Sequence, residues 1–113
     1  MQYMLLIYGN DEAWDDMSAP GREALDAAHR GVMADLTASG ELILSNELST
    51  TGAKLVRRGD DRLLVTDGPF SESKEWVGGF YVVDVESGDR AVEIAGRLEE
   101  TRFSVVEIRA LLH

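Results

Sequence analysis

Residues Val65 to Phe80 read VTDGPFSESKEWVGGF and decide how the rest of the chain is arranged. The Gly68-Pro69 dipeptide predicts a rigid turn, because proline fixes φ and glycine accepts backbone angles that cost other residues energy. We therefore expect one strand to end near Asp67 and a second apolar strand to begin after the pair of glycines near the end of the stretch. The charged and aromatic residues between the two strands exceed what a connection requires, which makes this segment a candidate functional surface.

Length and composition indicate one globular domain that spans residues 1–113. A chain of this size buries roughly 65% of its unfolded surface, enough for a self-supporting core. No segment approaches the roughly 20 consecutive apolar residues that a membrane-spanning helix needs. The sequence does not show the basic segment followed by an apolar run that would indicate a signal peptide. The chain has no cysteine, which excludes disulfides and thiolate metal sites and makes the cytoplasm the expected compartment.

The chain is strongly acidic, with 21 acidic and 11 basic residues and a formal net charge of −10. Such a charge repels phosphate backbones and anionic lipids, so we expect neither nucleic-acid nor membrane binding. The simplest interpretation of the acidity is a well-solvated surface. An acidic surface would also suit a basic protein partner, and the sequence leaves that alternative open.

Apolar periodicity and turn residues predict six strands and two helices. The strands are expected at residues 2–8, 41–48, 53–58, 62–66, 80–85 and 103–111. One helix should run from its N-cap Ser18 to a C-terminal cap at Gly40, and a second should follow the N-cap Ser87. Residues 9–16 are expected to form an acidic loop carrying Trp14, which should either cover a pocket or meet another subunit because so large an aromatic side chain needs a packing partner.

With the hairpin at residues 53–66 set aside, the elements follow the βαββαβ order of a ferredoxin-like sheet. The predicted fold class is therefore α+β, ferredoxin-like with an inserted hairpin. Two helices can cover only one face of such a sheet, yet the strand at residues 80–85 is apolar on both faces. A second copy presenting the same surface would hide the uncovered face, so we expect a homodimer with stacked sheets.

His29 is the first candidate for chemistry, because imidazole exchanges protons near neutral pH and the other histidine is the terminal His113. His29 also falls within the apolar stripe of the first helix. A hydrogen-bonded histidine at the edge of the core is the alternative, and residue type alone does not decide between the two.

Asp67 is the second candidate, because a carboxylate at a strand end can point into a cleft beside the Gly-Pro turn. The alternative is an Asx turn, in which the carboxylate accepts hydrogen bonds from the backbone that follows. Both can hold at once, since a carboxylate fixed by backbone donors stays ionised and could orient a histidine or bind an ammonium group.

The residues after the Gly-Pro turn form a third candidate group. Phe70, Glu72, Lys74, Glu75 and Trp76 could line a pocket for a small molecule, or they could belong to a solvated loop that closes over the core. The sequence leaves the two alternatives equally open.

Glu107 and Arg109 form the last candidate pair. Strand alternation sends both to the face assigned to the dimer, where a buried charge pair would cost several kcal/mol of desolvation per ion unless well paired. They can share a site with His29 only if His29 lies at the sheet edge, because His29 is expected on the opposite, helix-covered face.

Three short motifs resemble the signature of the YCII-related, DGPF-type proteins: DGPF at residues 67–70, SKEW at 73–76 and GGFY at 78–81. The resemblance covers nearly the whole chain and implies a dimeric α+β barrel. In the better-known YCII branch, a helix histidine and an aspartate are proposed as an acid/base pair, and His29, eleven residues before Gly40, matches that histidine. The segment VEIRAL at residues 106–111 resembles the family's last strand, with Ala110 in place of a proline.

Three functions remain open. The first is a small enzyme that performs proton transfer or hydrolysis on a metabolite, with His29 as acid/base and Asp67 as its orienting group. The second is a ligand-sensing or accessory regulatory dimer, because the resemblance implies an association with extracytoplasmic-function sigma factors. The third is a structural dimer without a site. The chain contains no phosphate loop, GxGxxG, nucleophile elbow or HExxH motif, so no cofactor or metal is indicated.

Overall fold

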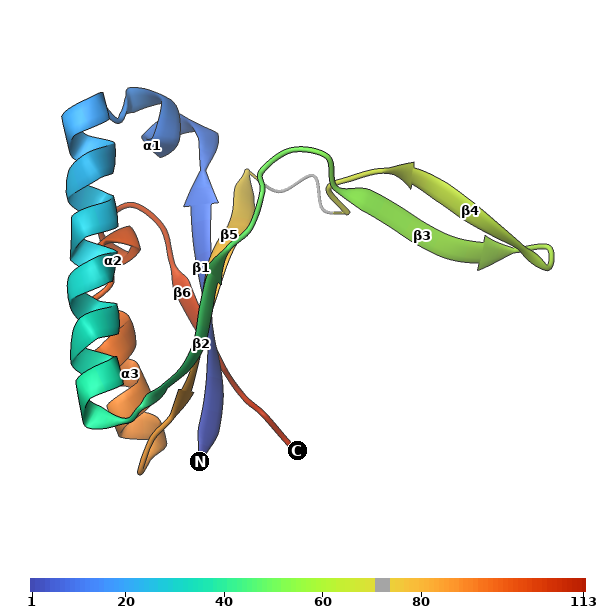
Figure 1. Cartoon of the computed structure of the whole chain (residues 1–113). Coiled ribbons are helices and arrows are strands. Elements are labelled where there is room, and N and C mark those ends of the chain that lie inside the picture. Colours follow the sequence, from blue (N-terminus) through green and yellow to red (C-terminus); the bar gives the residue numbers. More distant parts are fainter. Residues whose placement is uncertain (71–73) are drawn as a thin grey trace.

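The computed structural model describes residues 1–70 and 74–113, and its secondary structure is mixed α+β, which confirms the predicted class (Figure 1). Glu72, one of the predicted pocket residues, lies outside the described residues. The elements are β1 (Gln2–Asn10), α1 (Asp11–Asp16), α2 (Ala19–Ser39), β2 (Leu42–Glu47), β3 (Lys54–Gly59), β4 (Arg62–Asp67), β5 (Glu75–Asp84), α3 (Gly88–Gly96), the 3-10 helix η1 (Glu99–Arg102) and β6 (Val106–Ala110).

Four of the strands form one antiparallel sheet in the order β2-β5-β1-β6, with α2 and α3 on the same face (Figure 1). Leu5 of β1 lies opposite Tyr81 of β5 and Ile108 of β6. Side chains alternate between the faces of a strand, so these three share the helix-covered face. The core forms there, where Leu5 and Val83 are fully buried.

The first long helix forms where its caps and periodicity predict. The Ser18 side chain accepts a hydrogen bond from the Gly21 N–H at 3.1 Å, and Gly40 ends the helix in the left-handed conformation with φ of 80°. Leu25, Val32 and Leu36 are its buried residues, which are spaced so that they fall on one face. This face packs α2 on the sheet.

An ion pair ties α3 to the start of β2. Arg90 donates two hydrogen bonds to the carboxylate of Glu41, each at 2.9 Å, and a third to Glu93 at 3.1 Å. The bidentate contact holds the guanidinium in a fixed orientation. It also lowers the pKa of Glu41 to about 2, so this pair stays ionised under all ordinary conditions.

Three element boundaries differ from the sequence prediction. Residues expected to form an acidic loop form the short helix α1, because the Asn10 side chain accepts a hydrogen bond from the Ala13 N–H at 2.7 Å and acidic residues occupy the first turn. Strand β5 begins at Glu75, five residues earlier than predicted, since its first part pairs with the end of β1. Strand β6 begins at Val106, not at Phe103, because the N–H groups of Phe103 and Ser104 bond to the Glu100 carbonyl in the turn that ends η1.

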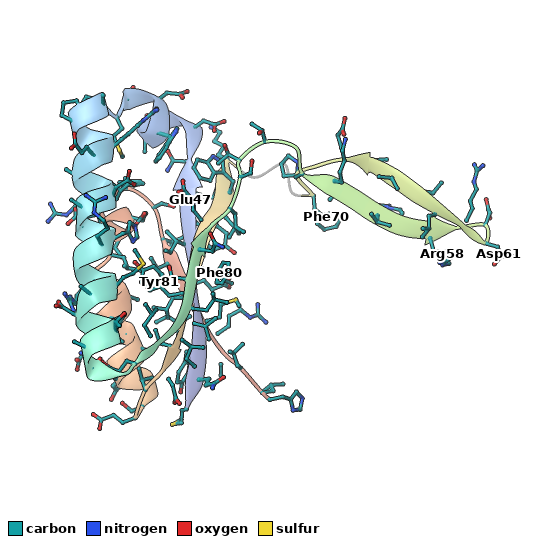
Figure 2. The ribbon with its side chains drawn as sticks, viewed as in Figure 1. Glu47, Arg58, Asp61, Phe70, Phe80 and Tyr81 are labelled. Atoms are coloured by element: carbon teal, nitrogen blue, oxygen red, sulfur yellow. The ribbon has the colours of Figure 1, made fainter. Side chains whose placement is uncertain are left out.

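Strands β3 and β4 form a separate two-stranded sheet, here called the arm (residues 54–67). The arm projects from the rest of the molecule on the side of the sheet opposite the helices (Figure 1). Its turn is the tight connection predicted from the sequence, with Asp60 and Asp61 at φ of 49° and 64°. Figure 2 shows Arg58 and Asp61 at the tip of the arm and Phe70 near its base.

The sheet face that carries no helix, here called the open face, has a mixed character. Leu6 of β1 lies opposite Phe80 of β5 and Glu107 of β6, and all three alternate away from the buried Leu5. Figure 2 shows Phe80 on this side of the sheet and Tyr81 on the helix side. Leu44 of β2 is also exposed. In the described part of the chain, no helix is long and apolar enough to cross a membrane.

Candidate functional site

A cavity of about 400 Å³ lies between α2 and the sheet, at the end of the molecule near α1. Its apolar wall includes two tryptophans, a phenylalanine and three aliphatic side chains: Ile7, Trp14, Leu25, Met33, Trp76 and Phe103. Its polar wall includes Asp26, His29, Arg30, Ser45, Glu47, Tyr81 and Glu100. A mostly apolar cavity with a few convergent polar groups is the usual form of a small-molecule site.

His29 lies at the centre of a hydrogen-bonded cluster in the cavity wall. Its Nε2 is 2.6 Å from Oε2 of Glu100, and its Nδ1 is 2.7 Å from the Tyr81 hydroxyl. Helix α2, the 3-10 helix η1 and strand β5 each contribute one of the three side chains. Both ring nitrogens are therefore occupied by protein groups, which fixes the orientation of the imidazole.

The electrostatic surroundings favour the protonated form of His29. The hydrogen bond to Glu100 raises the pKa of His29, and burial opposes this by favouring the neutral ring. The negative charges of Glu100, Asp26 and Glu47 add to the increase in pKa. Figure 2 labels Glu47 near the end of β2, on the same side of the molecule as Tyr81.

Tyr81 keeps its proton throughout the physiological range. Burial raises the pKa of Tyr81 to about 12, the charge of Glu100 acts in the same direction, and a hydrogen bond with Ser45 opposes both. When His29 is neutral with its proton on Nε2, the Tyr81 hydroxyl donates to Nδ1. When His29 is protonated, Nδ1–H donates to the Tyr81 oxygen. Titration of His29 thus reverses the direction of this hydrogen bond.

Glu100 is the buried acidic member of the cluster, with 8% of the residue exposed. It lies in η1, the turn that follows the end of α3, and its carbonyl accepts the Ser104 N–H at 2.8 Å. No described residue donates a hydrogen bond to its second carboxylate oxygen, Oε1. Sequence reasoning missed both Glu100 and Tyr81. For Glu100 the reason is that nothing in the local pattern distinguishes it from the neighbouring Glu99.

The two tryptophans meet edge to face in the cavity wall, with ring centroids 6.3 Å apart and planes at 82°. Trp76 lies against two glycines: a Cβ atom at Gly9 or at Gly78 would come within 2.8 Å of its ring. The Trp76 Nε1–H donates to Asp11 at 3.0 Å, which ties β5 to α1. Trp14, expected to cover a pocket or to meet another subunit, lines the cavity.

Asp67 and Phe70 do not join this cluster. Asp67 forms an ion pair with Lys54 at the base of the arm, where 83% of its side chain is exposed. Phe70 is also exposed near the base of the arm (Figure 2). Neither residue is among the described residues that line the cavity.

Lys74 and Glu75 line a second, more open depression beside α1. The Glu75 carboxylate accepts a hydrogen bond from the Ser104 hydroxyl at 2.6 Å. Of the four predicted pocket residues after the Gly-Pro turn that the structure describes, Trp76 alone lines the cavity between α2 and the sheet.

Glu107 and Arg109 lie on the open face and not with His29. Glu107 accepts a hydrogen bond from the Tyr8 hydroxyl at 3.0 Å, and this bond raises the pKa of Tyr8. Arg109 lies opposite Met4 in the pairing of β1 with β6. The geometric conflict noted from the sequence is therefore real: the two predicted groups lie on opposite faces of the sheet.

The fold and the cavity define a small α+β domain with a partly buried histidine–glutamate–tyrosine cluster beside an aromatic wall. Within residues 1–70 and 74–113, no set of three or more metal-binding side chains is grouped to hold an ion. The chain belongs to the YCII-related domain family, whose family model matches residues 1–113. It is 33% identical to the uncharacterized protein R00369 of Rhizobium meliloti (strain 1021), in an alignment that covers 98% of this chain and 92% of that protein.

Proposed function

We propose that the cavity binds a small metabolite and that the His29 cluster exchanges a proton with it. The observation that carries the proposal is the continuous hydrogen-bonded chain from Glu100 through His29 to Tyr81 in the cavity wall. Glu100, and not Asp67, takes the orienting role beside the histidine, because Asp67 is paired with Lys54 on the arm. A carboxylate that fixes one ring nitrogen and supports the imidazolium is a recurrent arrangement in acid–base catalysis.

Because both ring nitrogens are occupied, the proton reaches the ligand through the Tyr81 hydroxyl. Protonated His29 donates from Nδ1 to the Tyr81 oxygen while Tyr81 passes its own proton to the ligand, and the reverse sequence removes a proton from the ligand. Tyr81 lines the cavity, and its pKa of about 12 keeps the hydroxyl protonated. It therefore acts as a relay and not as an independent acid.

The size and lining of the cavity indicate the kind of ligand. Its volume lies at the lower end of the range of about 300–1,000 Å³ that is usual for small-molecule sites. The tryptophan pair favours a planar or apolar body. Three carboxylates and one guanidinium line the polar wall, which favours a neutral or cationic polar end over an anionic one.

We also propose that the domain is a ferredoxin-like homodimer of the α+β barrel type, located in the cytoplasm. The strand order β2-β5-β1-β6, with one helix in each half of the chain, supports the ferredoxin-like assignment. The partly apolar open face supports stacking of two sheets across a two-fold axis.

Binding calorimetry tests the site proposal. A ligand found by a thermal-shift screen of neutral and cationic metabolites is titrated into the protein in two buffers with different ionisation enthalpies. We expect a proton to be exchanged on binding to the wild type and no such exchange with His29→Gln. The Asp67→Asn variant is the matched control and should behave as the wild type. Proton exchange that persists in His29→Gln would exclude the cluster.

A ligand-sensing dimer without turnover is the second candidate. The observation that favours it is that protein groups already occupy both nitrogens of His29, which suits a rigid binding site as well as a catalytic one. Prolonged incubation of the bound metabolite, followed by NMR spectroscopy of the small molecule, separates the two functions. A chemically unchanged ligand favours sensing, and a product lost in the Tyr81→Phe variant favours catalysis.

A further inference from the structure

Within residues 1–70 and 74–113, the strands of the arm pair with no strand of the four-stranded sheet. Strands β3 and β4 pair with each other and belong to a sheet separate from the four-stranded one. A two-stranded hairpin alone in water is at best marginally stable, and a third strand or a packed surface is normally needed to hold it. A packed surface on the arm would therefore stabilise it, and the described part of the four-stranded sheet does not pair with it.

One face of the arm carries a strip of three neighbouring apolar side chains, flanked by Arg58 at one end and by Lys54 and Asp67 at the other. Val56 lies opposite Val65 in the pairing of β3 with β4, and Leu63 lies two residues before Val65 on the same face. The exposed fractions are 62% for Val56, 59% for Leu63 and 60% for Val65. Neighbouring apolar side chains on an exposed strand pair are typical of an interaction surface.

The charge of the arm differs from that of the rest of the chain. The arm contains four of the eleven basic residues but only three of the twenty-one acidic ones: Lys54, Arg57, Arg58 and Arg62 against Asp60, Asp61 and Asp67. The remainder of the chain therefore holds seven basic and eighteen acidic residues. A second copy of this chain offers the acidic surface that the arm complements.

The direction of the arm agrees with such a partner. It leaves the molecule on the side of the open face, away from the helices (Figure 1). A second copy stacked on the open face, as in the dimer of the proposed function on which this inference rests, would lie alongside the arm. Two-fold symmetry would place the partner's arm in the equivalent position.

We propose that the arm is a dimer clasp: its strip of Val56, Leu63 and Val65 packs on the body of a second copy of this chain, and its basic side chains pair with the acidic surface there. The arm thereby gains the packed surface that a lone hairpin lacks. The clasp extends the stacked-sheet interface beyond the open face and fixes the relative rotation of the two subunits.

Sedimentation velocity on matched variants tests the clasp. Leu63→Glu changes the strip, and Val92→Glu is the control, because Val92 of α3 is exposed to the same extent, 59%, but lies outside the arm. We expect a wild-type dimer at micromolar concentration, a dissociation constant raised at least about tenfold by Leu63→Glu, and no change with Val92→Glu. Raising the salt concentration should also weaken the wild-type dimer.

A second pair of measurements separates the clasp from the stacked sheets. Phe80→Glu places a charge on the open face, and replacement of residues 55–66 by two glycines removes the arm while circular dichroism reports whether the body still folds. A dimer that is lost with Phe80→Glu but unchanged in both arm variants overturns the clasp and leaves the proposed stacking intact. A wild-type protein that is monomeric at micromolar concentration overturns both. Equal weakening by Leu63→Glu and Val92→Glu would show that charge alone is responsible and would also overturn the clasp.

Discussion

The body of the molecule and its arm use the same residue types to opposite effect. Leu36 of α2 is completely buried, whereas Leu63 of the arm is 59% exposed. Likewise, His29 and Glu100 form a partly buried ionisable pair, whereas Lys54 and Asp67 form an exposed one. The contrast shows that location in the fold, and not residue type, decides whether a side chain of this chain is shielded from solvent.

The largest difference in the free energy of unfolding should separate a leucine of the body, Leu36, from a leucine of the arm, Leu63. We expect Leu36→Ala to lower the free energy of unfolding by about 2–5 kcal/mol, because it leaves a cavity in the core. Leu63→Ala should change it by no more than about 0.5 kcal/mol in the monomer. Urea denaturation at the lowest workable protein concentration measures both. Similar losses in the two variants would mean that the arm packs on its own body.

The next comparison of stability is between Glu100, the acidic partner of His29, and Asp67, the acidic partner of Lys54. Glu100→Gln should lower the free energy of unfolding by about 1–3 kcal/mol, because it weakens a buried hydrogen bond to a charged group. Asp67→Asn should change it by less than about 1 kcal/mol, as is usual for exposed pairs. Thermal and chemical denaturation of both variants tests this order, and a larger loss from Asp67→Asn would reverse it.

Removal of the Tyr81 hydroxyl should have a smaller effect. Tyr81→Phe eliminates one hydrogen bond to His29 and should cost about 1 kcal/mol. It should also abolish the ultraviolet transition of the tyrosine that ionises at about 12. Tyr8→Phe is the control, because Tyr8 bonds to Glu107 on the opposite face. Because the hydrogen bond to Glu107 also raises the pKa of Tyr8, the deciding protein carries both changes: a high-pH transition that persists in Tyr81→Phe combined with Tyr8→Phe would contradict the assignment.

The pH dependence of stability should be the smallest effect. The pKa of His29 is raised in the folded protein, so its ionic contribution is fully present below the unfolded value of about 6.5 and is lost as pH rises through the folded value. The wild type should therefore lose more stability than His29→Gln between pH 6 and pH 9. NMR titration of the ring protons gives the pKa directly, and a value below 6.5 would contradict the expected direction.

The first long helix could be predicted from the sequence, because local periodicity and capping residues carry that information. The spacing of Leu25, Val32 and Leu36, with a serine cap before and Gly40 after, is sufficient to define α2. The short helix α1 could not be predicted, because a run of acidic residues has weak helix propensity and its formation depends on one side-chain cap from Asn10.

The residues that line the cavity could be anticipated only in part, because they are distant in sequence. His29 and Trp76 could be identified from residue type and motif, and both line the cavity. Glu100 lies 71 positions from His29 and reaches it through a single 3-10 turn after α3, a geometry that no local pattern encodes. Asp67 was attractive because of its place before the Gly-Pro turn, but that turn belongs to the base of the arm.

The positions of Trp14 and Trp76 have a practical consequence. They are the only two tryptophans in the chain, and both line the same cavity. Intrinsic fluorescence excited at the red edge of the absorption band therefore originates almost entirely from this one place. A ligand that enters the cavity will alter the tryptophan emission without any attached dye. An event confined to the arm will leave the emission spectrum unchanged.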